Sequence, residues 1–195
     1  MRVVGGEARG RRFHAPPGWS TRPTSDRVRE AIFGVLGSLP ADGERPVGIE
    51  EATVADLFAG SGAFGIEALS RGAARAVFVD ADRQAVATIR DNLKGLGLAG
   101  PRATVVRADA LRWLRAAAPM DLVLCDPPYA FGQWAELSSL LAPLLAPVAG
   151  VAVLESGAPL RLGPEWEVLR EKHYGGTVVT VARPGPSPAQ PRPER

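Results

Sequence analysis

Apolar runs and helical patterns alternate along the chain from residue 53 to residue 154. Five apolar runs have the length of strands, at residues 53–58, 76–80, 103–106, 122–125 and 151–154. Four stretches with a helical spacing of apolar positions lie between them, at residues 64–70, 83–93, 110–116 and 134–145. Strands that are apolar throughout are typical of a sheet covered on both faces. The pattern therefore predicts an α/β fold with a doubly wound, mostly parallel sheet.

The last two predicted strands differ from the others in their connection. Residues 165–172 and 177–183 are both strand-like, and the link between them, which contains Gly175 and Gly176, is too short for a helical crossover. The two segments therefore predict an antiparallel hairpin at one edge, which brings the sheet to seven strands.

The N-terminal residues predict a small appendage. Residues 2–4 and 11–14 are strand-like and separated by glycines, which favours a short β-hairpin. A helix is predicted from Thr24 onward, with one apolar face formed by Val28, Ile32, Val35 and Leu36. Thr24 or Ser25 is placed to cap this helix.

These patterns divide the chain into four segments. We expect a basic hairpin and helix over residues 1–37, a connector over residues 38–52 and the main domain over residues 53–183. Residues 184–195 contain many prolines and are predicted to form a disordered tail.

Charge is distributed unevenly along the chain. The 195 residues carry a formal net charge of +2, and 46% of them are hydrophobic, as in an ordinary soluble domain. Residues 1–30 hold seven arginines and three acidic residues, a net charge of +4. Residues 31–182 hold thirteen basic and seventeen acidic residues, a net charge of −4. The N-terminal arm is therefore suited to a polyanionic partner.

Cysteine and histidine usage points to a cytoplasmic protein without a metal site. Cys125 is the only cysteine, which excludes an intramolecular disulfide, and its place in an apolar run predicts simple packing. His14 and His173 have no partners at metal-ligand spacing. The first residues do not resemble a secretory signal, and prolines and Gly150 interrupt the uncharged run at 137–154, so no membrane span is expected.

The first predicted strand of the main domain leads into a glycine loop. Gly60, Gly62 and Gly65 have the spacing GxGxxG, which lets the backbone turn tightly, approach a ligand and pack the next helix against the strand. Asp80 ends the next strand, twenty residues after Gly60, where a carboxylate can accept hydrogen bonds from ribose hydroxyls. Both features also occur in nicotinamide-binding domains.

Asp56, just before the glycine loop, separates the two classes of cofactor. A carboxylate there repels a pyrophosphate but attracts the ammonium and sulfonium groups of S-adenosylmethionine (SAM). Asp109 follows the third strand, where it can accept a hydrogen bond from an adenine amino group. Three acidic residues at three successive strand ends favour SAM.

The fourth strand is followed by the sequence Asp126-Pro127-Pro128-Tyr129. The prolines fix the backbone and donate no hydrogen bonds, so the Asp126 carboxylate and the Pro127 carbonyl are rigid acceptors. An exocyclic amine supplies two matching N–H donors. Tyr129 offers a flat face for a planar base, and Phe131 is placed either to line the same pocket or to pack beside it.

Together these motifs resemble the class I SAM-dependent amino methyltransferases. The N-terminal segment, with Arg22-Pro23-Thr24 and residues 26–30, narrows the resemblance to the RsmD-type family, which methylates N2 of a guanine in small-subunit (16S) ribosomal RNA. The resemblance covers residues 1 to about 183. It implies a Rossmann-like fold and direct methyl transfer without a metal.

The resemblance also implies a role for each motif residue. Asp126 and Pro127 would orient guanine N2, and Tyr129 would stack on the base. The SAM site would consist of Asp56, Phe58, Gly60, Gly62, Gly65, Asp80, Asp82, Asp109 and Ala110. Contacts with the RNA are expected from Arg9, Arg11, Arg12, Arg22, Arg27 and Phe131. The partner would be the small subunit or an assembly intermediate, and the protein a monomer.

Other acceptors and another cofactor class remain open at this stage. Adenine N6, cytosine N4 and protein glutamine amides present a similar planar amine to an Asp-Pro-Pro-Tyr site. A nicotinamide-dependent dehydrogenase or a non-catalytic nucleotide-binding module is a further alternative, which Asp56 and the Asp126 motif disfavour.

Overall fold

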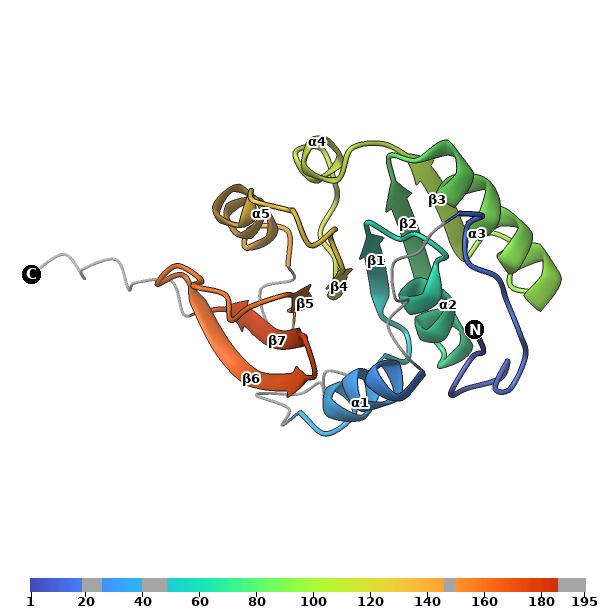
Figure 1. Cartoon of the computed structure of the whole chain (residues 1–195), viewed down its shortest axis with the longest axis horizontal. Helices are drawn as coiled ribbons and strands as arrows, with labels where there is room; N and C mark the ends of the chain where they lie inside the picture. Colours follow the sequence, from blue (N-terminus) through green and yellow to red (C-terminus); the bar gives the residue numbers. More distant parts are fainter. Residues whose placement is uncertain (19–25, 40–48, 146–149, 186–195) are drawn as a thin grey trace, which may run out of the picture.

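Seven strands form one sheet in the computed structural model, which describes residues 1–18, 26–39, 49–145 and 150–185 (Figure 1). The strand order is β3-β2-β1-β4-β5-β7-β6. The strands are β1 Thr53–Leu57, β2 Arg75–Asp80, β3 Ala103–Arg107, β4 Leu122–Cys125, β5 Val151–Ser156, β6 Trp166–Tyr174 and β7 Thr177–Pro184. Strands β1 to β5 are parallel, and the β6–β7 hairpin joins β5 in antiparallel orientation. The predicted fold class is confirmed.

Five helices cover the two faces of the sheet in the described part of the chain (Figure 1). Their bounds are α1 Asp26–Leu36, α2 Ala63–Ser70, α3 Arg83–Leu96, α4 Ala110–Leu114 and α5 Trp134–Leu141. One apolar core joins α1, α2, α3 and the N-terminal segment to one face, and a second core joins α4 and α5 to the other. None of these helices is long and apolar enough to cross a membrane.

The direction of winding changes between β1 and β4. These two strands are parallel neighbours, with Leu57 paired to Cys125, yet the helix after β1 covers one face and the helix after β4 covers the other. In open α/β sheets, ligands bind at the carboxyl ends of the strands on either side of such a switch point. Both the glycine loop and the Asp126 segment begin at this place.

Several element ends differ from the sequence prediction for local reasons. Helix α5 ends at Leu141, short of the predicted residue 145: Ala142 keeps helical backbone angles, but Pro143 has no N–H to continue the helical hydrogen bonds. Helix α3 extends to Leu96 and is terminated by Gly97, whose φ of 71° is left-handed. The N-terminal hairpin has a single bridge, between Arg2 and Arg12.

Parts of the predicted N-terminal and C-terminal organisation lie outside the described residues. They are the capping position at Thr24 or Ser25, most of the 38–52 connector and residues 186–195 of the predicted tail. Within α1 the predicted apolar face is correct for Ile32, Val35 and Leu36, but Val28 is only partly buried. Arg29, which was not predicted to be inside, is completely buried.

The third glycine of the loop brings α2 very close to β2. A Cβ atom added at Gly65 would lie 2.3 Å from Cε1 of Phe78, whose ring is fully buried. Only a residue without a side chain fits between this helix and the ring. The close packing expected of the glycine spacing is therefore present.

We expect Gly65→Ala to lower the free energy of unfolding by about 1–3 kcal/mol, because the buried Phe78 ring has to move. Gly95→Ala in α3 is the matched control, since nothing lies within 4 Å of a Cβ added there. The control should raise stability by about 0.5–1 kcal/mol through helix propensity. Urea unfolding measures both, and equal effects of the two substitutions would contradict this packing.

Candidate functional site

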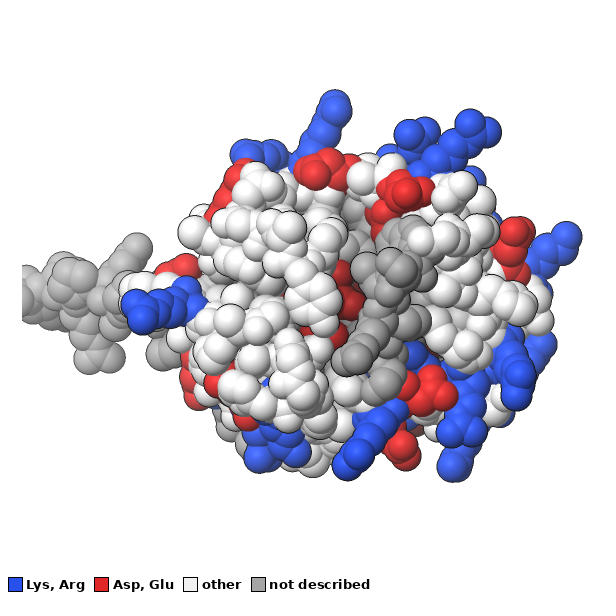
Figure 2. All heavy atoms as spheres, in the orientation of Figure 1, with Lys and Arg blue, Asp and Glu red and all other residues white. Residues whose placement is uncertain are grey.

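Four acidic residues stand at the carboxyl ends of four neighbouring strands. The residue two positions before each acid is buried in the core beneath α1, α2 and α3. Because side chains alternate between the two faces along a strand, the four acids lie on that same face. In strand order from β2 to β5 they are Asp80, Asp56, Asp126 and Glu155. Figure 2 shows acidic atoms at the bottom of a hollow near the centre of this view.

Two of these carboxylates hold the glycine loop. The Gly65 N–H donates to Oδ2 of Asp56 at 2.9 Å, and the Gly60 N–H donates to Oδ2 of Asp80 at 2.8 Å. The loop is therefore fixed at both ends by side chains from β1 and β2. Sequence reasoning assigned these acids to a cofactor, and the structure adds that they shape the loop that would bind it.

The loop backbone enters the left-handed region three times. The φ angles are 56° at Phe58, 56° at Gly60 and 79° at Gly62. Glycine adopts this conformation freely, but for a non-glycine residue such as Phe58 it costs about 1–2 kcal/mol. Gly62 forms the N-cap of α2 without a side-chain hydrogen bond.

Burial raises the pKa of the Asp56 carboxyl well above its ordinary value. The side chain is almost completely buried, and the negative charges of Asp126 and Asp80 raise the pKa further. The hydrogen bond from Gly65 opposes this shift without cancelling it. Burial likewise raises the pKa of Asp80, against the hydrogen bonds from the Asp82 and Gly60 N–H groups. A nearby cation would favour the ionised form of both groups.

The other predicted cofactor residues lie at helix starts on the same edge. Asp82 caps α3, because its Oδ1 accepts hydrogen bonds from the Gln84 and Ala85 N–H groups. Asp109 caps α4 by accepting from the Arg112 N–H at 2.9 Å, and Ala110 is the buried first residue of that helix. Sequence reasoning missed these capping roles. Their roles toward a cofactor stay predictions.

A small cavity of about 30 Å³ lies beside the Asp126 segment. Asp126 is half-buried, Pro127 is buried, and the Tyr129 ring is 71% exposed, which leaves its face accessible to a planar group. The segment ends in a turn in which the Phe131 N–H donates a hydrogen bond to Pro128 O at 2.8 Å. The cavity is lined by Asp126, Pro127, Pro128, Tyr129, Trp134, Glu155, Ser156 and Gly157.

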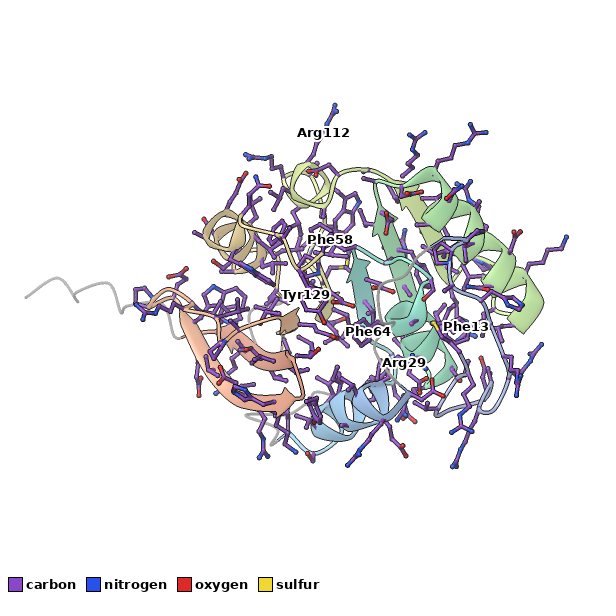
Figure 3. The ribbon with its side chains drawn as sticks, viewed as in Figure 1. Phe13, Arg29, Phe58, Phe64, Arg112 and Tyr129 are labelled. Carbon is purple, nitrogen blue, oxygen red and sulfur yellow. The ribbon has the colours of Figure 1, made fainter. Side chains whose placement is uncertain are left out.

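Three aromatic rings connect the glycine loop to this segment. The Phe131 ring makes edge-to-face contacts with Phe58, at 5.3 Å between centroids, and with Trp134, at 5.2 Å. Phe58 and Tyr129 are labelled in Figure 3 near the ends of the central strands. Phe131, predicted to line a base pocket, thus packs between the two halves of the site.

Sequence reasoning did not select the β5 side of the cavity. Glu155, Ser156 and Gly157 end the fifth parallel strand, and a Cβ added at Gly157 would lie 3.2 Å from Cδ1 of Tyr129. The available signal was the position of Glu155 at a strand end, like the three aspartates that were selected.

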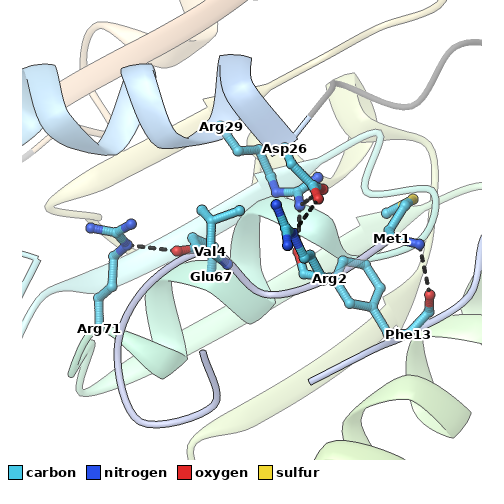
Figure 4. Close-up of polar contacts among 8 residues, drawn as sticks. All are labelled: Met1, Arg2, Val4, Phe13, Asp26, Arg29, Glu67 and Arg71. Carbon is cyan, nitrogen blue, oxygen red and sulfur yellow. Dashed lines mark hydrogen bonds and ion pairs between the residues drawn. The ribbon is translucent and has the colours of Figure 1, made fainter. Parts of the chain in front are cut away.

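Buried polar groups attach the N-terminal segment to this core. The Val4 N–H donates to Glu67 Oε2 at 2.8 Å, and Glu67 Oε1 accepts from Arg71 Nε at 2.7 Å (Figure 4). The Ser70 hydroxyl accepts from the Ala8 N–H and donates to Gly5 O. Segment and helix α2 therefore form one rigid unit.

Arg29 joins the same segment to α1. Its Nη2 donates to Arg2 O at 2.6 Å and to Asp26 Oδ1 at 2.7 Å, and its guanidinium lies over the Phe13 ring at 5.7 Å (Figure 4). Partial burial raises the pKa of Asp26, but the hydrogen bonds and charges of Arg29 and Arg2 outweigh it and leave the pKa below its ordinary value. Arg29 is thus structural.

The five predicted RNA-contacting arginines fall into three groups. Arg9, Arg12 and Arg27 are exposed, and Arg9 and Arg27 line a cavity of about 320 Å³ between the N-terminal segment and α1. Arg11 donates hydrogen bonds to Leu96 O and to Gly95 O at the end of α3, which satisfies carbonyls that lack helical partners. Arg22 lies outside the described residues.

Two remaining expectations concern cysteine and metals. Cys125 is buried in the second core, and burial raises the pKa of its thiol well above the ordinary value. Among the described residues, no group of three or more His, Cys, Asp or Glu side chains is arranged to hold a metal ion.

Comparison with solved structures agrees with the fold. The Escherichia coli protein yhhF superposes with a TM-score of 0.79 at 34% identity, covering 94% of this chain and 97% of that one. Hypothetical protein TTHA0928 of Thermus thermophilus superposes with a TM-score of 0.74 at 31% identity, covering 94% and 99%.

Sequence comparison places the chain in a family. The model described as conserved hypothetical protein 95 matches residues 1–183. Ribosomal RNA small subunit methyltransferase D of Escherichia coli K12 is 38% identical over 181 residues, 90% of this chain and 85% of that protein. YlbH of Bacillus subtilis strain 168 is 47% identical over 133 residues, 66% of this chain and 67% of that protein. The chain therefore belongs to the family of conserved hypothetical protein 95, the ribosomal RNA small subunit methyltransferase D family.

Proposed function

We propose that this protein transfers the methyl group of SAM to the exocyclic N2 of a guanine in small-subunit ribosomal RNA. The observation that carries this proposal is the Asp126-Pro127-Pro128-Tyr129 segment beside a glycine loop at the switch point of the sheet. Relatives named ribosomal RNA small subunit methyltransferase D support the RNA substrate.

The residues around the glycine loop fit SAM by their chemistry. When bound, SAM supplies a methyl group attached to a positively charged sulfonium. Asp56 and the loop from Gly60 to Gly65 would hold its charged methionine part, with Asp80 at the ribose and Asp109 at the adenine. The raised pKa of Asp56 supports its place in this assignment, because a cation would relieve the cost of burying its negative charge.

Asp126 and the Pro127 carbonyl would accept the two N–H bonds of the guanine amine. Held between two acceptors, the nitrogen can direct its lone pair toward the methyl carbon. Bound SAM would supply the methyl carbon to this lone pair and leave as S-adenosylhomocysteine, and one amine proton would be released to water. Most of the rate gain comes from proximity and orientation, for which intramolecular reactions allow about 7–11 kcal/mol.

Tyr129 and the N-terminal arginines would hold the RNA. The exposed Tyr129 ring offers a stacking surface for the target base, which contributes about 1–3 kcal/mol per base. A base in a helical stack has to be flipped out to reach it. Arg9, Arg12 and Arg27 are available for phosphate contacts, since their side chains are exposed.

We expect Asp126→Ala to lower the single-turnover methylation rate at least about a hundred-fold, because the amine loses a fixed acceptor. SAM affinity and the unfolding midpoint should stay near the values of the unaltered protein. Asp91→Asn, an exposed change on α3, is the control for removal of a carboxylate. Transfer of labelled methyl groups to small-subunit RNA measures the rate, and an active Asp126→Ala variant would rule out this role.

The raised pKa of Asp56 predicts how SAM affinity depends on pH. Below this pKa the free protein carries a proton on Asp56, and binding a cation favours its release. Affinity should therefore rise with pH until the pH passes the raised pKa, and then level off. Calorimetry in two buffers of different ionisation enthalpy detects the released protons. Asp56→Asn should reduce the release and weaken binding roughly 10- to 100-fold; a release as large as that of the unaltered protein argues against Asp56.

RNA binding should depend on the exposed N-terminal arginines. Replacing Arg9, Arg12 and Arg27 by glutamine should weaken RNA binding and reduce the slope of log affinity against log salt by about 0.7–0.9 for each phosphate that is no longer neutralised. Arg170→Gln on the edge strand β6 is the control, because this arginine is exposed and lies outside the N-terminal segment and α1. Filter binding at several salt concentrations gives the slope for the triple variant and for the control. Equal slopes would mean that the N-terminal arm does not contact the RNA.

A further inference from the structure

Glu155 occupies the position next to Asp126 across two paired strands. Cys125 of β4 pairs with Leu154 of β5, so the following residues, Asp126 and Glu155, are neighbours on the same face. Both line the cavity that also contains Tyr129. The Glu155 side chain is only 8% exposed, so water screens its charge poorly.

The strand that carries Glu155 is firmly held. Glu155 pairs with Val179 and Ser156 pairs with Val178 on β7, and the Ser156 hydroxyl donates to Ala158 O at 2.7 Å. The next residue, Gly157, packs against the Tyr129 ring. The carboxylate therefore projects from a fixed strand end that contacts the stacking surface directly.

Strand order places Glu155 on the side of Asp126 away from the glycine loop. The order β2-β1-β4-β5 sets the loop residues on one side and Glu155 on the other. The carboxylates of Asp126 and Glu155 thus stand side by side at the cavity that also contains Tyr129. A base whose amine is held at Asp126 would bring a ring atom beside its amine-bearing carbon within reach of Glu155.

The identity of that ring atom distinguishes guanine from the other bases. Beside its amine-bearing carbon, guanine has N1–H, a donor, on one side and N3, an acceptor, on the other. Adenine has N1 and cytosine has N3 at the corresponding position, and both are acceptors. A carboxylate only accepts hydrogen bonds, and with several lone pairs it can accept more than one. It therefore attracts the guanine edge and repels the other two.

We propose that Glu155 accepts the N1–H of the target guanine and thereby makes the enzyme specific for guanine. This inference rests on the proposed function, because it assumes that a base amine is held at Asp126. In this proposal Glu155 binds the substrate and determines specificity, whereas Asp126 orients the amine alone.

The test starts with the unaltered protein and unmodified small-subunit RNA made by transcription. Nucleoside mass spectrometry identifies the product, and mapping gives the methylated position. If no N2-methylguanosine forms, the proposed function is wrong. If it forms, RNAs that carry adenine or 1-deazaguanine at the mapped position test Glu155, since 1-deazaguanine keeps the amine and lacks the N1–H.

Removing either partner of the hydrogen bond should have the same effect. We expect Glu155→Ala to lower kcat/KM for the guanine RNA about 10- to 100-fold, with SAM affinity unchanged. Replacing guanine by 1-deazaguanine should lower kcat/KM of the unaltered protein by about 10- to 100-fold more than it lowers kcat/KM of Glu155→Ala. Glu155→Gln, which keeps the shape and can donate to adenine N1, should raise the ratio of adenine to guanine methylation.

Glu171→Gln, an exposed change on β6, is the matched control and should leave all rates unchanged. The inference is overturned if Glu155→Ala methylates guanine RNA at the normal rate. It is also overturned if Glu155→Ala still prefers guanine over 1-deazaguanine as strongly as the unaltered protein does. The second outcome means that Glu155 only supports the fold. The arms that use the unaltered protein do not depend on how the variants fold.

Discussion

Two backbone N–H groups and two buried carboxylates determine the geometry of the whole site. Gly65 donates to Asp56 and Gly60 donates to Asp80, and these hydrogen bonds fix the loop across the ends of β1 and β2. A buried carboxylate is costly unless it accepts hydrogen bonds, so loop and carboxylates stabilise each other. Because β4 pairs with β1, with Cys125 opposite Leu57, this register then places Asp126 next to the loop.

The acidic edge and the basic arm serve different partners within one small domain. The carboxylates lie on one face at strand ends, where a cationic cofactor and the donor groups of a base are favourable. Exposed arginines lie on the N-terminal segment and α1. The charges of +4 over residues 1–30 and −4 over residues 31–182 cancel, so the overall charge of +2 describes neither region.

The fold and part of the site were predictable because their signals are local. Apolar runs, glycine spacing and strand-end acids such as Asp56 and Asp126 each depend on a few consecutive residues. Long-range contacts were missed, since nothing near Arg29 in the sequence shows that its guanidinium is buried under the N-terminal segment. The capping of α3 by Asp82 was also missed, and the assignment of this residue to the cofactor stays a prediction. Glu155 has no motif around it, and only the pairing of β4 with β5 places it beside Asp126.

The buried amide of Asn92 gives the two ends of the site a common anchor. Its Nδ2 donates to His14 O at 2.8 Å and to Ser61 O at 2.9 Å, and its Oδ1 accepts from the His14 N–H. One side chain on α3 thus bridges the N-terminal segment and the glycine loop. Neither of them can therefore shift without moving the other or breaking hydrogen bonds of this buried amide.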